Sequence, residues 1–144
     1  MDNYEHLNEI LVYLFDHTLD IERKFLITEA FKDISVNDMH IINAIGLKAT
    51  VNMSSLAKKV GVTVGTLTIA INGLVRKEYV MRSRSNTDRR VVLVSLTERG
   101  NEAFRHHAEF HRRIVDAIHS ALNDEECSII IQGLSAFEKY LNEI

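Results

Sequence analysis

Four arginines and an aspartate are grouped in the segment "RSRSNTDRR" at residues 82–90. The flanking runs 79–85 and 89–96 are rich in β-formers and "SNTDR" is rich in turn residues, so the pattern predicts a β-hairpin with a charged tip. Asp88 lies two residues from Arg90, where its carboxylate can hold the guanidinium in one rotamer and lower the ordering entropy on binding. The alternative is a turn-forming aspartate beside solvated arginines.

The arginines of this hairpin are suited to DNA. A guanidinium on a slender ribbon fits the narrow, strongly negative minor groove of DNA, so we expect Arg90 to enter that groove. The other hairpin arginines, which we expect to meet the DNA backbone, are Arg82, Arg84 and Arg89.

The residues before the hairpin predict two short helices joined by a tight turn. Asn52 and Thr63 are candidate N-caps, and Gly61 suits the positive φ that often ends a helix. The inner face of the second helix carries Val64, Leu67, Ile71, Leu74 and Val75, and the opposite face carries Gly65, Thr66, Ile69, Gly73 and Arg76. Small residues, hydroxyls and an exposed apolar group are what a helix that reads the major groove requires. We therefore expect Thr63, Gly65, Thr66 and Ile69 to contact DNA. The alternative is that both glycines serve packing and that Ile69 belongs to the core.

The charge distribution supports a nucleic-acid partner although the net charge is −3. Residues 48–99 hold ten Lys and Arg against three acidic residues, a local charge of +7, and the remainder of the chain carries −10. A basic middle between acidic ends concentrates phosphate attraction on one surface. Double-stranded DNA is the partner that this pattern favours.

Three motifs carry a resemblance to a known family. The segments "VNMSSLAKKVGVTVGTLT" (51–68), "DRR" (88–90) and "LTERG" (96–100) resemble the MarR family of winged-helix regulators. The segments "FKDISVNDMHIINAIG" (31–46) and "RSRSNTDRRVV" (82–92) resemble in particular its branch that represses fatty-acid synthesis genes in Gram-positive cocci. The resemblance implies a homodimer with the second helix in the major groove and the wing in the minor groove. It also implies a long acyl chain, delivered on acyl carrier protein, as a corepressor that strengthens DNA binding. Asp88 and Arg90 match the paired wing residues of the family.

Apolar periodicity predicts long helices at both ends. Residues 4–28 repeat apolar positions at alternating spacings of four and three, which is typical of a helix packed along another helix. Residues 97–122 carry two neighbouring apolar stripes, which indicates a helix between two surfaces, and 123–144 form a last helix capped by Asn123. Ser35 predicts the start of another helix. We expect a mostly α fold with a small β-hairpin wing, in one MarR-type domain over 1–144. Within it, 1–30 and 101–144 are dimerisation helices and 31–100 are the winged helix-turn-helix. Two-fold symmetry then requires a pseudo-palindromic operator.

The composition and motifs of the chain argue against several classes of protein. The chain has 144 residues, no proline and one cysteine, which excludes an intrachain disulfide. It shows no signal-peptide pattern and no apolar run of the roughly 20 residues that a membrane span needs, so we expect a cytoplasmic protein with no membrane partner. Without a Gly-rich phosphate loop or a catalytic constellation at a recognisable spacing, the sequence does not predict an enzyme.

Three kinds of effector are compatible with the sequence. His107 and His111 are four apart on one helix and His40 could approach them, as in a zinc site for which Asp38 or Glu109 could add a carboxylate; the alternative is a hydrogen-bonded packing pair. Thiol sensing would depend on Cys127, although a free cysteine is usually buried and inert. No cofactor is predicted.

The effector that the resemblance implies is the acyl chain. Its apolar tunnel could be lined by Leu14, Ile41, Ile42, Phe104, Ala108 and Phe110, each equally credible as core. Acyl carrier protein is acidic and would dock on exposed cations, for which Arg105, Arg112 and Arg113 are candidates. A structural DNA-binding dimer without any ligand is the remaining alternative.

Overall fold

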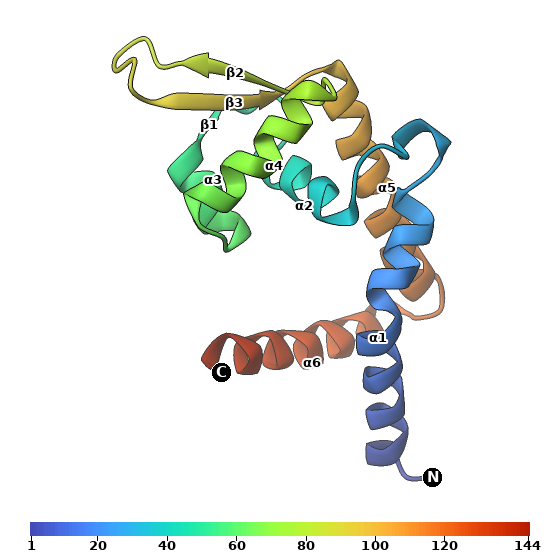
Figure 1. Cartoon of the computed structure of the whole chain (residues 1–144). Coiled ribbons are helices and arrows are strands. Elements are labelled where there is room, and N and C mark those ends of the chain that lie inside the picture. Colours follow the sequence, from blue (N-terminus) through green and yellow to red (C-terminus); the bar gives the residue numbers. More distant parts are fainter. The chain divides into compact units, whose positions relative to one another are not determined.

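The computed structural model describes all 144 residues, as six α-helices, a 3₁₀ turn and a small antiparallel sheet (Figure 1). The mostly α fold with a hairpin wing is confirmed. In chain order the elements are α1 (Asn3–Leu26), the 3₁₀ turn η1 (Glu29–Phe31), α2 (Val36–Ile45), β1 (Val51–Asn52), α3 (Met53–Val60), α4 (Val64–Arg76), β2 (Val80–Arg84), β3 (Val92–Leu96), α5 (Glu98–Ser120) and α6 (Asp124–Glu143).

The predicted caps start the helices. Ser35 and Asp38 form a capping box at α2, since each side chain accepts from the other residue's backbone N–H. The Asn52 side chain accepts from the N–H of Ser55 at 2.8 Å, and Asn123 caps α6 in the same way. Gly61 ends α3 in the left-handed region at φ 82°, a conformation that glycine adopts without steric cost.

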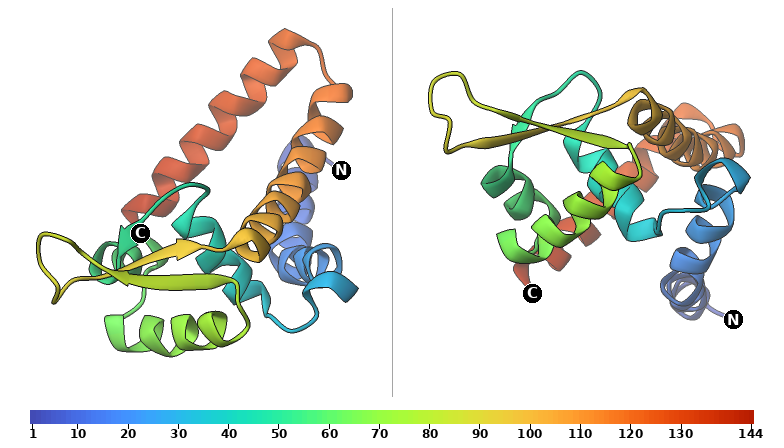
Figure 2. Two further views of the ribbon diagram at one scale, coloured as in Figure 1. Left: turned by 90° about the horizontal axis from the view of Figure 1, so that it is seen from above. Right: turned by 45° about the horizontal axis from the view of Figure 1, so that its top comes forward.

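The sheet has one strand more than the sequence predicts. Its order is β1-β3-β2, and the two-residue strand β1 pairs with β3 through Val51 opposite Val94. Two residues are too few to show a strand period, so the pattern could not reveal β1. The hairpin strands are shorter than predicted, because Arg89 and Arg90 lie in the turn between β2 and β3 and not in a strand. Figure 2 shows this turn as a long loop that extends beyond α4.

The chain forms two compact units, Met1–Phe110 and His111–Ile144. In the first unit α2, α3, α4 and the sheet enclose a core that also receives Leu26 of α1 and Ala103 and Phe110 of α5. Leu67, Ile71 and Leu74 of α4 are buried as predicted, but the prediction for Val64 is wrong, since its side chain is 45% exposed. Val64 is the first residue of α4 and lies beside the start of α3, at the edge of a hollow that opens to solvent.

The end of α4 is fastened to the start of α5. The Thr97 hydroxyl donates to the Glu78 carbonyl at 2.5 Å and accepts from the N–H of Gly100, so it caps α5 as predicted and also holds the preceding turn. The Thr97 N–H donates to the carbonyl of Tyr79. A Cβ at Gly100 would lie 2.1 Å from that same carbonyl oxygen, so only glycine permits this approach.

Asp33 ties this junction to the segment before α2. The buried Tyr79 donates its hydroxyl to Asp33 Oδ1 at 2.7 Å, and Arg99 donates to Asp33 Oδ2 at 3.1 Å. The Arg99 guanidinium also lies over the Tyr79 ring, 4.4 Å from its centroid. Burial and the neighbouring Asp33 raise the pKa of Tyr79, which keeps its hydroxyl protonated as a donor. Although burial opposes it, the Tyr79 hydrogen bond and the Arg99 charge hold the pKa of Asp33 below its ordinary value.

The second unit contains the end of α5 and all of α6, and no residue of α6 is buried. Large exposed apolar side chains cover both of its helices, including Ile114, Val115, Ile118, Ile129, Ile131 and Leu134. Helix α1 in the first unit is similarly apolar and exposed, with Leu7, Leu14, Phe15 and Leu19 each at least 47% exposed. These are the surfaces that the sequence assigns to the dimer. None of the helices has the length and apolarity that a membrane crossing requires.

We expect Asp33→Asn to destabilise the protein by about 0.5–1 kcal/mol near neutral pH, because the partly exposed pair with Arg99 loses its charge. A carboxyl whose pKa is lower in the folded state stabilises the fold above its unfolded pKa, and this contribution disappears as pH falls through the folded value. The stability difference between parent and Asp33→Asn should therefore shrink as pH falls below the ordinary value of 3.8. Urea unfolding of both proteins at several pH values from about 7 to about 3 measures this difference in unfolding free energy. A difference that does not change with pH would contradict this account.

Candidate DNA-binding interface

The outward face of α4 is open to solvent. Thr63, Gly65, Thr66, Ile69 and Arg76 are all exposed, and Ile69 is 75% exposed. A Cβ on Gly65 would lie 3.9 Å from Thr63 Oγ1 and one on Gly73 would lie 3.8 Å from Arg76 Nη2, both at ordinary van der Waals contact. The alternative that Ile69 belongs to the core and the glycines serve packing is therefore wrong. This face presents a backbone that can approach closely and one apolar side chain suited to a thymine methyl group.

The hydroxyls at the start of α4 differ in what they can offer. Thr63 accepts from the N–H of Thr66 at 3.1 Å and donates its own proton to Thr66 Oγ1 at 3.0 Å. Its hydroxyl is therefore used within the helix cap. The Thr66 hydroxyl accepts that bond and retains its proton for an outside acceptor, such as a phosphate or a base edge. Of the two threonines, Thr66 is better placed to donate to DNA.

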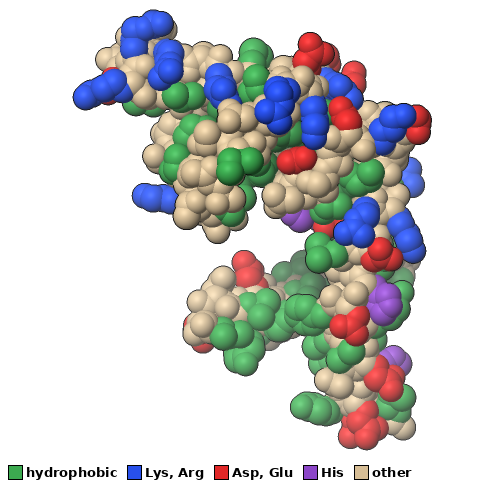
Figure 3. All heavy atoms as spheres, viewed as in Figure 1, with side chains coloured by type: hydrophobic (Ala, Val, Ile, Leu, Met, Phe, Trp, Pro, Cys, Tyr) green, Lys and Arg blue, Asp and Glu red, His purple; other side chains and the backbone are tan.

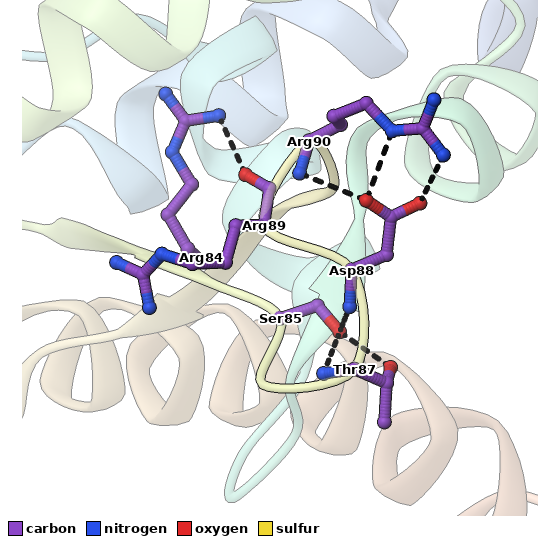
Figure 4. A network of polar contacts seen from close by, with 6 residues as sticks. All are labelled: Arg84, Ser85, Thr87, Asp88, Arg89 and Arg90. Atoms are coloured by element: carbon purple, nitrogen blue, oxygen red, sulfur yellow. Dashed lines mark hydrogen bonds and ion pairs between the residues drawn. The ribbon is translucent and has the colours of Figure 1, made fainter.

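Asp88 and Arg90 form the pair that the sequence predicts in the wing (Figure 4). Arg90 Nε and Nη2 each donate to one carboxylate oxygen of Asp88 at 3.1 Å, and the Arg90 backbone N–H donates to Oδ1 as well. The Arg90 hydrogen bonds lower the pKa of Asp88, so the carboxylate stays charged at neutral pH. The Arg90 side chain remains 91% exposed. The pair thus fixes the direction of the guanidinium while leaving it open to a ligand.

The rest of the turn is also held by polar contacts. Ser85 accepts from the N–H groups of Thr87 and Asp88, and Arg84 Nη1 donates to the Arg89 carbonyl at 3.3 Å (Figure 4). Arg84 therefore bridges the two sides of the hairpin end. Figure 3 shows Lys and Arg side chains gathered on the hairpin, consistent with the basic middle of the sequence.

Asn72 belongs to this surface although the sequence gave no reason to select it. Its Oδ1 accepts from Arg82 Nη2, which joins α4 to β2. Asn72 and Arg82 line a hollow of about 330 Å³ between α4 and the wing, with Met53, Thr68, Ser83, Arg84 and Val92. A lone asparagine inside a helix carries no signal of such a contact.

The histidines predicted as a possible metal site meet a carboxylate that the sequence did not indicate. Glu22 of α1 is 6% exposed, and its Oε1 lies 2.6 Å from His40 Nε2 and 3.3 Å from His107 Nε2. The two imidazole rings stack with centroids 5.5 Å apart. His111 follows His107 by one turn of α5, and the alternative carboxylate Asp38 is used in the capping box of α2. The 2.6 Å contact is a hydrogen bond, so buried Glu22 and His107 and the exposed His40 form a packing cluster that also holds ligand types that zinc accepts.

The six residues predicted to line an acyl tunnel do not share one environment. Ile41, Ile42 and Phe110 are buried in the core and Phe104 packs against it, whereas Leu14 is 47% exposed and Ala108 is exposed. The hollows described between α3, α4 and the wing are lined by other residues. In the second unit an apolar hollow of about 190 Å³ is lined by Val115, Ile118, His119, Cys127, Ile130, Ile131 and Leu134. An acyl site at the six residues stays a prediction.

We expect Arg90→Ala to weaken DNA binding and to lower the slope of log affinity against log salt by about 1, because one phosphate-attracting cation is lost. Asp88→Ala should cause a smaller part of the same loss, because the cation remains but its direction is no longer fixed. Fluorescence anisotropy at several salt concentrations measures both. Lys32→Ala, which removes a cation outside residues 48–99, is the control. Parent-like binding by Arg90→Ala would overturn the role given to the wing.

Several known proteins are similar to this chain in sequence, and one of them also in structure. The MarR family model matches residues 34–92. The crystal structure of Streptococcus pneumoniae FabT in complex with DNA is 38% identical, with a TM-score of 0.87 over 98% of this chain and 99% of that one. The HTH-type transcriptional regulator SarZ of Staphylococcus aureus is 28% identical over 133 residues, 92% of this chain and 88% of SarZ. YfiV of Bacillus subtilis, an HTH-type transcriptional regulator, is 29% identical over 110 residues, 76% of this chain and 68% of YfiV. The chain therefore belongs to the MarR family of DNA-binding transcriptional regulators.

Proposed function

We propose that the protein is a homodimeric repressor of fatty-acid synthesis genes that binds a pseudo-palindromic operator more tightly when long-chain acyl-acyl carrier protein is present. The observation that carries this proposal is the likeness to FabT, which extends over 98% of this chain at 38% identity. The motifs at 31–46 and 82–92, which resemble the fatty-acid branch of the family, support it.

The distribution of exposed side chains supports the homodimer. Helix α1 and the second unit expose long apolar surfaces, which an isolated chain would leave in water at a cost of about 25 cal/mol per Å². A second copy of the same chain can cover equivalent surfaces on both protomers at once. The dimer then presents two copies of α4 and of the wing to two half-sites of DNA.

Two of the three arginines that we expect to contact acyl carrier protein already form ion pairs within the chain. Arg105 lies 3.8 Å from Glu98, and Arg112 lies 2.5 Å from Asp116, while all four side chains remain more than half exposed. Exposed pairs of this kind contribute at most about 1 kcal/mol, so an acidic carrier protein can replace the internal partners. The two arginines are seven residues apart in the sequence of α5.

A second candidate function is zinc-responsive repression through His40, His107 and His111. The observation that favours it is Glu22, whose buried carboxylate lies against both His40 and His107. Carboxylate oxygen and imidazole nitrogen are ligands that zinc takes in proteins. The same contacts also satisfy a buried carboxylate without any metal, which is why the lipid effector remains the first proposal.

We expect long-chain acyl-acyl carrier protein to tighten binding to a fatty-acid-gene promoter fragment, while unacylated carrier leaves it unchanged. Fluorescence anisotropy titration at fixed salt, with each carrier form and with no addition, measures the effect. Charge reversal at Arg105, Arg112 and Arg113 should abolish the tightening and leave binding without carrier as in the parent. Equal affinity with and without acylated carrier would contradict the lipid effector, and a response that survives charge reversal would contradict the docking surface.

Under the zinc-responsive alternative, Glu22→Gln lowers zinc affinity by about tenfold or more, because an amide oxygen is a weaker zinc ligand than a carboxylate. Even the loss of a residue that only hydrogen-bonds to a metal ligand lowers metal affinity by about tenfold or more. Competition with a chromogenic chelator measures zinc affinity directly, independently of DNA. Glu102→Gln, an exposed position on α5, is the control. Equal zinc affinity in parent and Glu22→Gln would exclude this cluster as the zinc site.

A further inference from the structure

Arg82 and Arg90 are both directed by a hydrogen-bonding partner, but the two partners differ in charge. Asp88 is an anion and offsets part of the Arg90 charge, whereas Asn72 is a neutral amide. An arginine can only donate, so the Asn72 oxygen faces Arg82 and its amide nitrogen is turned away. The contact therefore fixes a direction for Arg82 and leaves its full positive charge available.

The contact also joins the two elements that meet DNA. Asn72 is on α4, four residues after Thr68 and seven after Gly65, so it lies at the edge of the outward face, on the side that contacts Arg82 of the wing. Arg82 is on β2, opposite Val94 of β3, so its position follows from the register of the hairpin. Figures 1 and 2 show α4 running beside the base of that hairpin. Arg82 itself stays exposed, and the hollow that it lines with Asn72 and Arg84 opens to solvent.

We propose that Asn72 is a positioning residue for DNA binding, which holds the Arg82 guanidinium toward a backbone phosphate at the junction of α4 and β2 without neutralising it. Phosphate contacts set the register of a protein on the duplex, and Lys and Arg charges supply their strength. A cation held at this junction fixes the reading helix and the wing relative to the same stretch of backbone. The inference rests on DNA binding by the family and not on the fatty-acid role.

Asn72→Ala should weaken operator binding by about three- to tenfold, the cost of immobilising one long side chain on binding. Asn72→Asp should weaken it further, because the nearly isosteric carboxylate keeps the hydrogen bond but cancels the charge and repels the phosphate. Asn43→Ala, at an exposed position on α2, should bind like the parent. Parent affinity in Asn72→Ala, or tighter binding in Asn72→Asp than in Asn72→Ala, would overturn the proposal.

A double-mutant cycle separates positioning from direct contact or a structural role. In the Arg82→Ala background, Asn72→Ala should have no further effect on affinity, because the residue it acts through is absent. An undiminished loss in that background would overturn the proposal, and circular dichroism with thermal unfolding checks that each variant is folded. The DNA is any duplex the parent binds, selected from a random pool if the promoter fragment is not bound. A failure of the fatty-acid proposal therefore leaves this test intact.

Discussion

The turn between α4 and β2 touches the first turn of α5, and the position of the wing depends on that contact. Tyr79 is buried at 0% exposure, its carbonyl accepts from the N–H of Thr97, and Gly100 lies against the same carbonyl. Any side chain at position 100 would force α5 away from the turn, and β2 begins at the next residue, Val80. The motif "LTERG" thus has a physical meaning: a cap that reaches back to the turn, an arginine that reaches Asp33, and a glycine that allows close approach.

With its base fixed in this way, the wing tip is organised by side chains from its own short turn. Ser85 and Asp88 satisfy backbone N–H groups of the turn, and Asp88 directs Arg90 into solvent. Because the tip is already ordered, it loses less conformational entropy when it binds DNA. The disadvantage is that the negative Asp88 carboxylate lies near the negatively charged DNA. We expect the tip to enter a narrow minor groove, where that disadvantage is tolerable only if the carboxylate stays behind the guanidinium. The bidentate geometry enforces this order, since both Asp88 oxygens are taken by Arg90.

The features that the sequence predicted are those whose cause lies within a few residues. Caps at Ser35, Asn52 and Thr63 and the left-handed Gly61 act over three residues, and the exposed face of α4 follows from helical geometry. The missed features join distant positions: Glu22 with His40 across 18 residues, and Asp33 with Tyr79 across 46. The spacing and composition of a single sequence do not indicate which distant residues will form such pairs. The Asp88–Arg90 pair was predictable because both partners lie in one turn, whereas Asn72 and Arg82 belong to different elements.

The cluster around Glu22 limits how any effector can act. A buried carboxylate is costly unless polar groups contact it, and the imidazoles of His40 and His107 supply those contacts, so the three residues link α1, α2 and α5. Ile41 and Ile42 follow His40 directly and are buried in the core. An acyl chain that reached them would have to open the core beside this cluster. A zinc ion would instead replace the Glu22–His40 hydrogen bond with metal bonds. Both candidate sites include residues of α2, which are His40 for zinc and Ile41 and Ile42 for the acyl chain. We therefore expect either effector to act through α2 on the helices that it packs against.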